Sequence, residues 1–565
     1  MRARTRGAVL AAALLLAMAS AACGGGGDDD GDTSGGQGAS ALGDNVIDGP
    51  QENEGEPVTG GSITVGLESE TNTYLPSQFQ GSQAGYNVAY AVFDPLVTRD
   101  ADGEIQPYLA ESIEPNDDFT QWTLTLRSGV TFHDGTPLNA EAMKRIFDDY
   151  LTADGALTRS ALRDVDRMEI VDDLTVRYVL NQPNAAFPDV LALPAGWPFS
   201  PDAADEAGDA FGEHPVGTGP FKFVSWQRDG ALVLERNEDY WQEGLPYLDR
   251  ITFRAIPDEE TRATSLASGD VDAVQSVRLS SFVTRVQDIP GVEIALGMNN
   301  GGQNIMFNTS EPPVDDARVR RALAHAVDQQ ALVDVVAGDA AAVTELRTQF
   351  FASDSPWYSE WVAEAWPDYD PERAQQLIDE YVNDPERSDG KPVGSPVTLE
   401  LDTTNVPSLI EQATAYQGFW EEIGVEASIR PVEQSVHITE ALTGDYQIKS
   451  FRAGLDQDPL PVFEGAFGDP EQFVTNFTNY RTPEIEQALE TLRTTDDPET
   501  RAAAVEEVGL QLAEDLPIYW TGSDIPLIAY ADDIEGVAGW TLPDGSLGDG
   551  ATPAITFWSQ VWVAE

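Results

Sequence analysis

Alternation of apolar and polar positions predicts several β-strands from residue 62 onward. The segment Ser62-Ile63-Thr64-Val65-Gly66-Leu67 alternates in this way. The segments 122–126, 174–180 and 231–235 show strand patterns of the same kind. Because successive side chains on a strand point to opposite faces, each of these segments is expected to bury one face.

A helical spacing of apolar residues predicts helices in the second half of the chain. Asp315 or Asp316 can cap a helix that ends near Gly338. Its buried face would carry Val319, Leu323, Ala326 and Val327. A second helix is expected to open at Thr482-Pro483-Glu484, with proline in its first turn. This mixture of strands and helices predicts α/β or α+β domains.

The first 22 residues have the pattern of a signal peptide. Three arginines within residues 2–6 precede a short apolar run at 8–19, and small residues lead to Cys23. This order is typical of an export signal. Small residues directly before Cys23 also resemble a bacterial lipobox, in which the cysteine is lipidated after cleavage. The alternative is an ordinary cleavable signal followed by an incidental cysteine.

Residues 23–57 are expected to form a flexible tether. They are rich in Gly, Ser and acidic residues and show no hydrophobic period. A linker of this composition reaches about 30–35 Å on average. Such a tether would keep a domain near the outer face of the bacterial cell membrane through its lipid, with no direct binding to the bilayer.

The charge balance excludes several partners. The 565 residues include 32 Lys and Arg against 97 Asp and Glu, a net charge of −65. A surface of this sign repels nucleic acid and anionic lipid headgroups. Cys23 is the one cysteine, so no disulfide holds the fold, and the four scattered histidines offer no metal-ligand spacing. We therefore expect no metal and no cofactor.

Four segments of the chain form an ordered set of motifs. They are Phe132-His133-Asp134-Gly135-Thr136-Pro137 and its continuation to Glu141, Gly217-Thr218-Gly219-Pro220-Phe221 continuing to Tyr240-Trp241, Leu266 to Asp272, and Phe307-Asn308-Thr309 leading to Arg318–Asp328. In sequence and in order they resemble the family 5 extracellular solute-binding proteins, the receptors of oligopeptide, dipeptide and nickel importers. The resemblance covers roughly residues 60 to 530.

The resemblance implies an α/β, two-lobed periplasmic-binding-protein-like fold of type II, cluster C, with a subdomain inserted in the first lobe. Lobe I would comprise 58–85, 212–295 and 525–565, the insertion 86–211, and lobe II 296–524. Gly217 and Gly219 permit backbone angles closed to other residues, and Pro220 then fixes one, so these three residues are candidates for a hinge. The alternative is a tight turn without ligand contact.

The resemblance also implies a ligand-binding cleft. Tyr74 aligns with a segment that lines the cleft in this family, although core packing explains it equally well. Trp357 and Trp361 lie in an aromatic-rich stretch of lobe II and could stack on a ligand or fill the core. In peptide-binding relatives an Asp before an acidic-Pro pair holds the peptide's amino terminus. Aligning on Asp458-Pro459 puts Asp456 one residue late.

Arg452 stands where peptide binders often carry Trp. It could form a bidentate contact with a ligand carboxylate or phosphate. The alternative is a surface arginine paired with one of the many acids.

The implied function is that of an extracytoplasmic receptor that captures a small ligand, a peptide in the first instance, and delivers it as a monomer to ABC permease subunits. An oligosaccharide, an opine-like compound or chelated nickel are alternative cargoes, and a peptide sensor is an alternative role. A secreted hydrolase is the rival class. The chain lacks Gly-x-Ser-x-Gly and His-Glu-x-x-His, so we expect no enzyme.

Overall fold

The computed structural model of the protein describes most of the chain after residue 44. The described residues are 45–51, 55–79, 82–152, 157–228, 230–277, 281–297, 300–353, 355–453, 458–470, 472–549 and 554–564. All of them belong to one compact unit. Among these residues no helix is both long and apolar enough to cross a bilayer.

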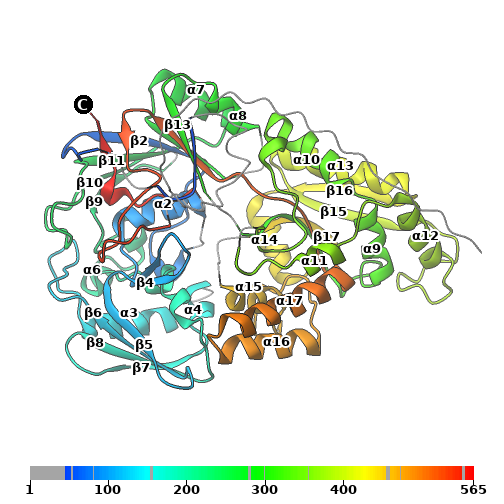
Figure 1. Ribbon diagram of the computed structural model, residues 1–565, viewed down its shortest axis with the longest axis horizontal. Helices are drawn as coiled ribbons and strands as arrows, with labels where there is room; N and C mark the ends of the chain where they lie inside the picture. Colours follow the sequence, from blue (N-terminus) through cyan, green and yellow to red (C-terminus); the bar gives the residue numbers. More distant parts are fainter. Residues whose placement is uncertain are drawn as a thin grey trace, which may run out of the picture. The chain divides into compact units, whose positions relative to one another are not determined.

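An eight-stranded sheet forms the core of lobe I (Figure 1). Its strands, in spatial order, are β1 (Val46–Asp48), β13 (Val292–Leu296), β19 (Leu527–Ala531), β12 (Ala273–Ser276), β2 (Ser62–Leu67), β11 (Arg250–Ala255), β10 (Ala231–Arg236) and β9 (Phe221–Trp226). The helices of this lobe are α2 (Gln83–Val92), α7 (Glu259–Ser268) and α8 (Phe282–Gln287). The strands predicted at 62–67 and 231–235 are confirmed.

Strand β1 corrects the prediction that residues 23–57 are all tether. Val46, Ile47 and Asp48 pair in parallel with Ile294–Leu296 of β13. The Asn45 side chain donates to the carbonyl oxygen of Val292 at 2.9 Å. Three residues are too few to show a strand period, so the pairing depends on the exposed edge of β13 and not on a local pattern. Residues 46–48 of the predicted tether therefore belong to the sheet of lobe I.

The insertion is built on a four-stranded antiparallel sheet. Its elements are β5 (Ala110–Pro115), β6 (Gln121–Leu126), β8 (Thr175–Leu180), β7 (Val165–Ile170), α3 (Ala140–Thr152), α4 (Leu157–Ala161), α5 (Phe187–Val190) and α6 (Pro201–Ala207). The strands predicted at 122–126 and 174–180 are confirmed as β6 and β8, which pair directly. Asn139 caps α3 by accepting from the Ala142 amide at 2.9 Å.

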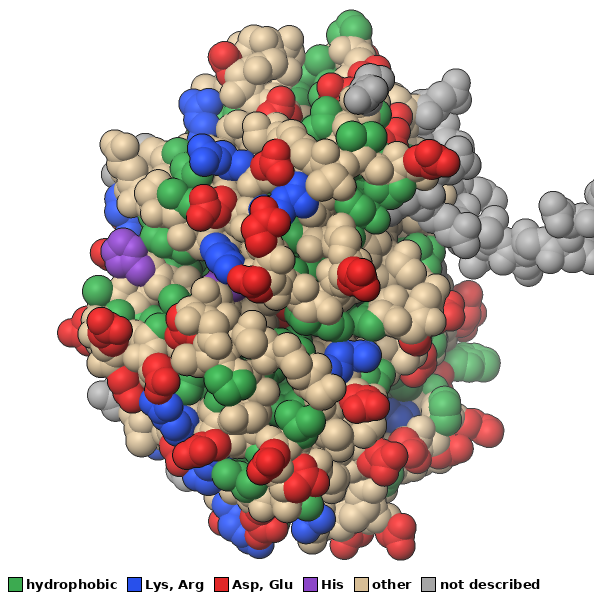
Figure 2. Space-filling view, turned by 90° about the vertical axis from the view of Figure 1, so that its left-hand side faces the viewer, with side chains coloured by type: hydrophobic (Ala, Val, Ile, Leu, Met, Phe, Trp, Pro, Cys, Tyr) green, Lys and Arg blue, Asp and Glu red, His purple; other side chains and the backbone are tan. Residues whose placement is uncertain are grey.

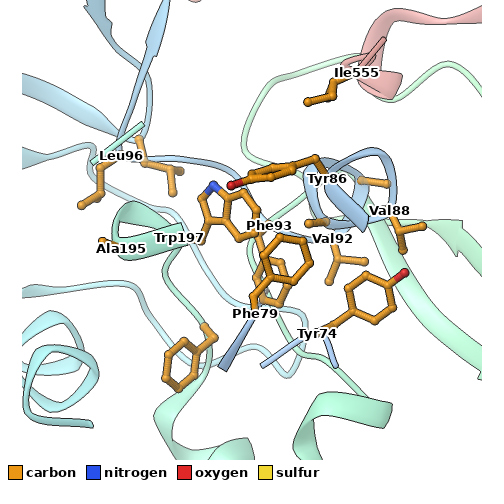
Figure 3. Packing of buried hydrophobic residues seen from close by; sticks show 14 of the residues in the cluster. Tyr74, Phe79, Tyr86, Val88, Val92, Phe93, Leu96, Ala195, Trp197 and Ile555 are labelled. Atoms are coloured by element: carbon orange, nitrogen blue, oxygen red, sulfur yellow. The ribbon is translucent and has the colours of Figure 1, made fainter. Parts of the chain in front are cut away.

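Lobe I and the insertion share one hydrophobic core. Trp197 of the insertion is 1% exposed and packs against Phe79 of lobe I and against two rings on α2 and at its end (Figure 3). Its ring centroid lies 5.4 Å from that of Phe79, 5.4 Å from Tyr86 and 6.1 Å from Phe93. Because rings from both segments bury one another, we expect the insertion and lobe I to move as one body.

A five-stranded sheet forms lobe II. Its strands, in spatial order, are β16 (Glu426–Val432), β15 (Thr398–Thr404), β17 (Ile448–Ala453), β14 (Gly302–Phe307) and β18 (Ile518–Gly522). The helices are α9 (Ala317–His325), α10 (Gln329–Ala337), α11 (Glu360–Ala365), α12 (Pro371–Val382), α13 (Pro407–Glu422), α14 (Gln434–Thr443), α15 (Pro459–Phe467), α16 (Pro483–Thr494) and α17 (Pro498–Asp515). This lobe has its own hydrophobic core.

The single helix predicted between Asp316 and Gly338 is two helices. Asp316 caps α9 as expected, but α9 ends at His325. Asp328 then caps α10, which ends at Gly338. An aspartate inside the pattern accepts hydrogen bonds from the next turn, so it starts a new helix instead of continuing the first. Thr482 caps α16, as predicted.

Short elements complete the described part of the chain. They are β3 (Val97–Arg99) paired with β4 (Ile105–Pro107), β20 (Ile534–Glu535) paired with β21 (Trp562–Val563), and the 3₁₀ turns η1 (Pro76–Gln78), η2 (Pro194–Gly196), η3 (Gly208–Glu213), η4 (Gly338–Val343) and η5 (Trp558–Gln560). The main chain passes from lobe I to lobe II between β13 and β14, and returns between β18 and β19.

The segment 217–220 packs tightly against the end of α2. A Cβ atom on Gly217 would lie 2.1 Å from the Val92 carbonyl oxygen, and one on Gly219 would lie 2.5 Å from the Val92 carbonyl carbon. Neither glycine has a positive φ. The prediction that unusual backbone angles select these glycines is therefore wrong, and close backbone approach is the reason. With Pro220 they join the insertion to β9, away from the two passages between the lobes.

The end of the second motif stabilises the same junction. The hydroxyl of Tyr240 and the indole N–H of Trp241 donate to the Asp94 carboxylate at 3.0 and 2.8 Å. Asp94 is 2% exposed, and its burial raises the pKa of the carboxyl to about 7. His133 of the first motif contacts the Gly219 carbonyl oxygen through Nε2 at 2.9 Å. These motif residues therefore have structural partners.

Acidic side chains are scattered over the face of the molecule seen in Figure 2 instead of forming one patch. Figure 2 shows Asp and Glu interspersed with Lys and Arg on one face of the molecule. Interspersed charge of this kind favours solubility without creating one strong binding patch on that face.

Candidate functional site

Arg452 bridges the two lobes. It lies near the end of β17 in lobe II, and its Nη1 donates to the carbonyl oxygen of Val277 in lobe I at 2.9 Å. Its Nη2 donates to Oε1 of Gln83, the first residue of α2, at 3.3 Å. The side chain is 26% exposed. A guanidinium in this position lies between the lobes and still reaches solvent.

Asp524 holds this arginine from the passage between β18 and β19. Its Oδ2 lies 3.7 Å from Nε of Arg452, while Oδ1 accepts from the Gln303 side chain at 2.6 Å. The Asp524 side chain is 1% exposed. The aspartate therefore orients the arginine from behind and leaves the guanidinium as the group that faces outward.

Buried polar side chains lie on the strands beside this arginine. Gln275 lies on β12, two residues before Val277, and is fully buried; neither of its amide atoms has a hydrogen-bond partner among the described residues. Ser276 Oγ and Asn304 Oδ1 are likewise buried without a partner there. Because buried polar groups are nearly always hydrogen-bonded, these are candidate contacts for a polar ligand.

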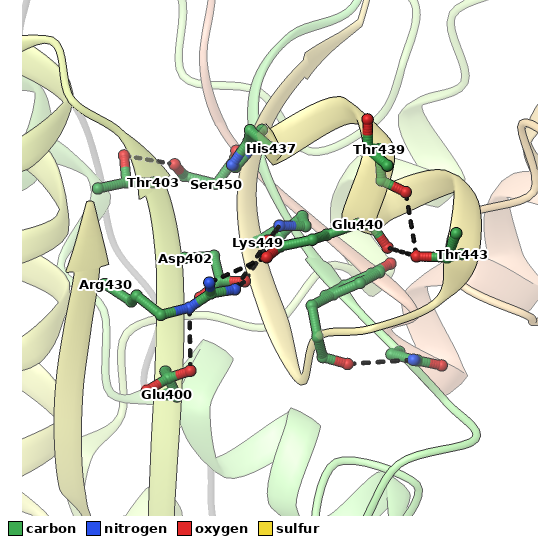
Figure 4. Close-up of polar contacts among 12 residues, drawn as sticks. Glu400, Asp402, Thr403, Arg430, His437, Thr439, Glu440, Thr443, Lys449 and Ser450 are labelled. Atoms are coloured by element: carbon green, nitrogen blue, oxygen red, sulfur yellow. Dashed lines mark hydrogen bonds and ion pairs between the residues drawn. The ribbon is translucent and has the colours of Figure 1, made fainter. Parts of the chain in front are cut away.

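A charged network supports β17 from the other side (Figure 4). Lys449 is fully buried, and its ammonium lies 3.0 Å from Asp402 Oδ2 and 3.2 Å from Glu440 Oε2. Arg430 reaches the same two carboxylates at 2.6 and 2.8 Å. Hydrogen bonding from Arg430 is the main cause that lowers the pKa of Glu440 to about 2. The network fixes α14 onto β15, β16 and β17, and so positions Arg452.

His437 on α14 adds a neutral contact. Its Nε2 lies 3.0 Å from the Ser450 carbonyl oxygen, and its ring stacks on Phe451 with centroids 5.9 Å apart. Burial, with Lys449 adding to it, lowers the pKa of His437 to about 4. The imidazole is therefore neutral at pH 7, and its N–H can donate to the strand next to Arg452.

Two aromatic candidates have packing partners. Tyr74 is 3% exposed, and its ring centroid lies 5.0 Å from that of Trp226 in the lobe I core. Trp357 is half-buried against the lobe II core, and the Arg501 guanidinium lies 5.5 Å from its ring centroid. Both placements favour the packing alternative.

The remaining candidates lie apart from Arg452 or outside the described residues. Trp361 on α11 is 66% exposed. The Asp458 carboxylate caps α15 by accepting from the Leu460 amide at 2.8 Å and also pairs with Arg501. Asp456 and Cys23 fall outside the described residues. Among the six ligand-binding candidates, Arg452 is the one that the described structure places between the lobes.

Sequence reasoning missed Gln83 and Asp524, which contact the Arg452 guanidinium, and Gln303, which donates to Asp524. Gln83, Gln303 and Asp524 come from three separate parts of the chain, and no motif joins them. Two local signals could have located part of this set: the capping serine before Gln83 marks the start of a helix, and the apolar pattern around Gln303 marks a buried strand. Among the described residues, no group of three or more His, Cys, Asp or Glu side chains could hold a metal ion.

Two sheet-based lobes joined by two passages, with polar groups where they meet, define a solute-binding protein. The profile of the bacterial extracellular solute-binding proteins, family 5 (Middle), matches residues 104–473. The chain belongs to this family, as the ordered motifs indicated. Such proteins are extracytoplasmic receptors that work with ABC importers.

The chain is similar to several characterised members. The glutathione-binding protein GsiB of Salmonella typhimurium is 30% identical over 478 residues, which are 81% of this chain and 88% of that protein. The GsiB of Pectobacterium atrosepticum is 29% identical over 456 residues, 78% of this chain and 85% of that protein.

Solved structures confirm the fold. AgaA of A. tumefaciens R10, in complex with agropinic acid, superposes with a TM-score of 0.76 at 24% identity, covering 89% of this chain and 99% of that one. The oligopeptide-binding protein AppA of Bacillus subtilis, in complex with a nonapeptide, gives 0.76 at 22%, covering 90% and 100%. The two-lobed type II architecture is thus shown.

Proposed function

We propose that this receptor captures a short peptide or peptide-like ligand that carries a carboxylate. The observation behind this is Arg452, the bridging guanidinium held by the buried Asp524. A guanidinium matches a carboxylate with two parallel hydrogen bonds. Glutathione, which gives the GsiB relatives their name, is a tripeptide with two carboxylates. Gln275 and Ser276 would supply further hydrogen bonds to its amide groups.

Capture would proceed by closure of the lobes over the ligand. The two passages between the lobes allow them to rotate, and contacts that exist only in the closed state would favour that state. A shift from 1:99 to 99:1 needs about 5.5 kcal/mol of differential affinity. A carboxylate bound to Arg452 from one lobe and to polar groups of the other would provide part of it. No covalent chemistry is required.

We further propose that the mature protein is attached to the outer face of the cell membrane through lipidated Cys23 and delivers its ligand, as a monomer, to ABC permease subunits. The support is the signal-like segment 1–22 and the linker before β1. A lipid chain with a flexible linker would let the receptor dock and leave.

Native mass spectrometry of the protein purified from its own host tests the proposal. Bound masses that leave on mild unfolding and match short peptides would support it. A single mass of a sugar or another ligand without a carboxylate would overturn the peptide assignment and keep the receptor. If the protein is isolated empty, calorimetric titration with glutathione, and with the tripeptide Ala-Ala-Ala as comparison, decides the class of ligand. The absence of binding heat with both glutathione and Ala-Ala-Ala would contradict the proposed ligand class.

A further inference from the structure

Four charged residues join the insertion to lobe II in an alternating chain. Arg163 and Asp164 lie between α4 and β7 of the insertion, while Glu464 lies on α15 and Arg493 on α16 of lobe II. Arg163 pairs with one oxygen of Glu464, and Arg493 pairs with the other. Arg493 also lies 3.5 Å from Asp164 Oδ2. We call these four residues the interlobe clasp.

Three of the four clasp side chains are largely buried. The side chain of Glu464 is 1% exposed, that of Asp164 is 6%, and that of Arg493 is 11%. The Arg163 guanidinium lies 4.1 Å from the ring centroid of Phe473 in lobe II. The Arg493–Glu464 pair lies within lobe II, whereas the Arg163–Glu464 and Arg493–Asp164 pairs exist only while the insertion and lobe II stay in contact.

Hydrogen bonds around the clasp also cross between the two parts. The Ala185 amide of the insertion donates to the Arg493 carbonyl oxygen at 2.9 Å. Asn184 donates to Asp164 through its side chain at 3.0 Å, and Gln182 does so at 2.7 Å. Both groups hold the Asp164 carboxylate in place for Arg493.

The covalent structure leaves this contact free to break. The insertion is attached to lobe I, and lobe II is joined to lobe I by the passages between β13 and β14 and between β18 and β19. The insertion has no covalent link of its own to lobe II. Figure 1 shows α4 beside α15, in agreement with the Arg163–Glu464 pair. Rotation of lobe II about its passages would break the Arg163–Glu464 and Arg493–Asp164 pairs, and the loss of such largely buried ion pairs is unfavourable.

We infer that the clasp holds the lobes together in the absence of ligand and thereby sets the ligand affinity without touching the ligand. A protein that is already partly closed binds its ligand more tightly, because the apparent dissociation constant scales inversely with the closed fraction. The consequence for affinity rests on the proposed function, whereas the effect on closure does not.

The test compares Glu464→Gln with the ligand-free wild type. The amide has the size of the carboxylate but carries no charge to hold two arginines. Arg163→Met is the second variant, because its side chain is more exposed and its loss is better tolerated. Arg145→Gln is the matched control: it removes an exposed arginine that pairs with Asp202 and Asp205 inside the insertion.

Two ligand-free measurements read out closure. We expect both clasp variants to increase the radius of gyration in small-angle X-ray scattering and to speed hydrogen exchange at the Ala185 amide at least 10-fold, while Arg145→Gln changes neither. We also expect a several-fold weaker affinity for glutathione. An unchanged radius of gyration and an unchanged exchange rate in both variants would overturn the inference. This holds even if the variants have a lower melting temperature, because that alone would show only a loss of stability. Opening without any glutathione binding would support the clasp and contradict the proposed ligand class.

Discussion

The Arg452 guanidinium of lobe II donates to the Val277 carbonyl oxygen of lobe I across 2.9 Å, and so ties the end of β17 to the end of β12. These strands belong to different sheets. A carbonyl oxygen is a weaker partner for a guanidinium than a carboxylate. A ligand carboxylate between the lobes can therefore take this interaction over, and the same residue would then serve closure and recognition.

Replacing Arg452 with Gln is expected to weaken binding of a carboxylate ligand by about 10- to 100-fold. A hydrogen bond to a charged group contributes about 1.5–3 kcal/mol, which sets this range. Isothermal titration with glutathione, at fixed ionic strength, measures the effect. Arg452→Lys keeps the positive charge but loses the two parallel N–H donors of the guanidinium, so we expect its affinity to lie between those of the wild type and Arg452→Gln.

The matched control for this measurement is Arg373→Gln. Arg373 is an exposed arginine that pairs with Glu380 on the same helix, α12. We expect the Arg373→Gln variant to bind glutathione with the same affinity as the wild type. An unchanged affinity in Arg452→Gln would contradict a role of this arginine in ligand recognition.

Gly217→Ala is expected to destabilise the protein, because the added methyl group would meet the Val92 carbonyl oxygen at 2.1 Å. Overpacking of this kind costs about 1–3 kcal/mol. Gly418→Ala is the control, since a Cβ at that position of α13 meets nothing within 4 Å and alanine favours helix. Chemical denaturation should show a lower free energy of unfolding for Gly217→Ala and a slightly higher one for Gly418→Ala. A neutral Gly217→Ala would contradict the close-approach explanation.

The fold could be predicted further than the site because its signals are local. Alternation placed β2 and β6, and the capping residue Thr482 placed α16. Where a signal depends on distant partners, prediction failed. β1 forms only because β13 offers an edge, and Gly217 is required only because Val92 lies beside it.

The site shows the same limit. Arg452 was predicted because it departs from a family position, and it does lie between the lobes. Its partners Gln83 and Asp524 are 441 positions apart in the chain. Both reach Arg452 only because the folded chain brings the two lobes together. Asp458 was a candidate by its acidic-Pro pattern, but that same pattern also marks the start of a helix, which is its role in α15.

Lys449→Met is expected to cost about 3–5 kcal/mol of unfolding free energy. The lysine is fully buried between Asp402 and Glu440, and its removal leaves two acids that share Arg430 alone. Lys144→Met is the control, since Lys144 forms an exposed pair with Asp148 and should cost less than about 1 kcal/mol. Denaturant titrations measure both. Adding Asp402→Asn to Lys449→Met should recover part of the loss; no recovery would show that the ammonium stabilises through packing.

Stability should fall as the pH drops from about 6.5 toward 4, in part because of His437. Burial lowers the pKa of its imidazole to about 4, against 6.5 for an ordinary histidine. Within this window the unfolded chain binds a proton that the folded protein does not, so the free energy of unfolding decreases as the pH decreases. The group contributes a slope of up to about 1.4 kcal/mol per pH unit.

His437→Gln is the control variant, because it keeps a donor for the Ser450 carbonyl oxygen and removes the titration. The difference between the wild-type and variant stability profiles should therefore slope between pH 4 and 6.5 and be flat above it. A flat difference over the whole range would mean that the folded imidazole titrates normally, and NMR titration of the His437 ring would then show a midpoint near 6.5.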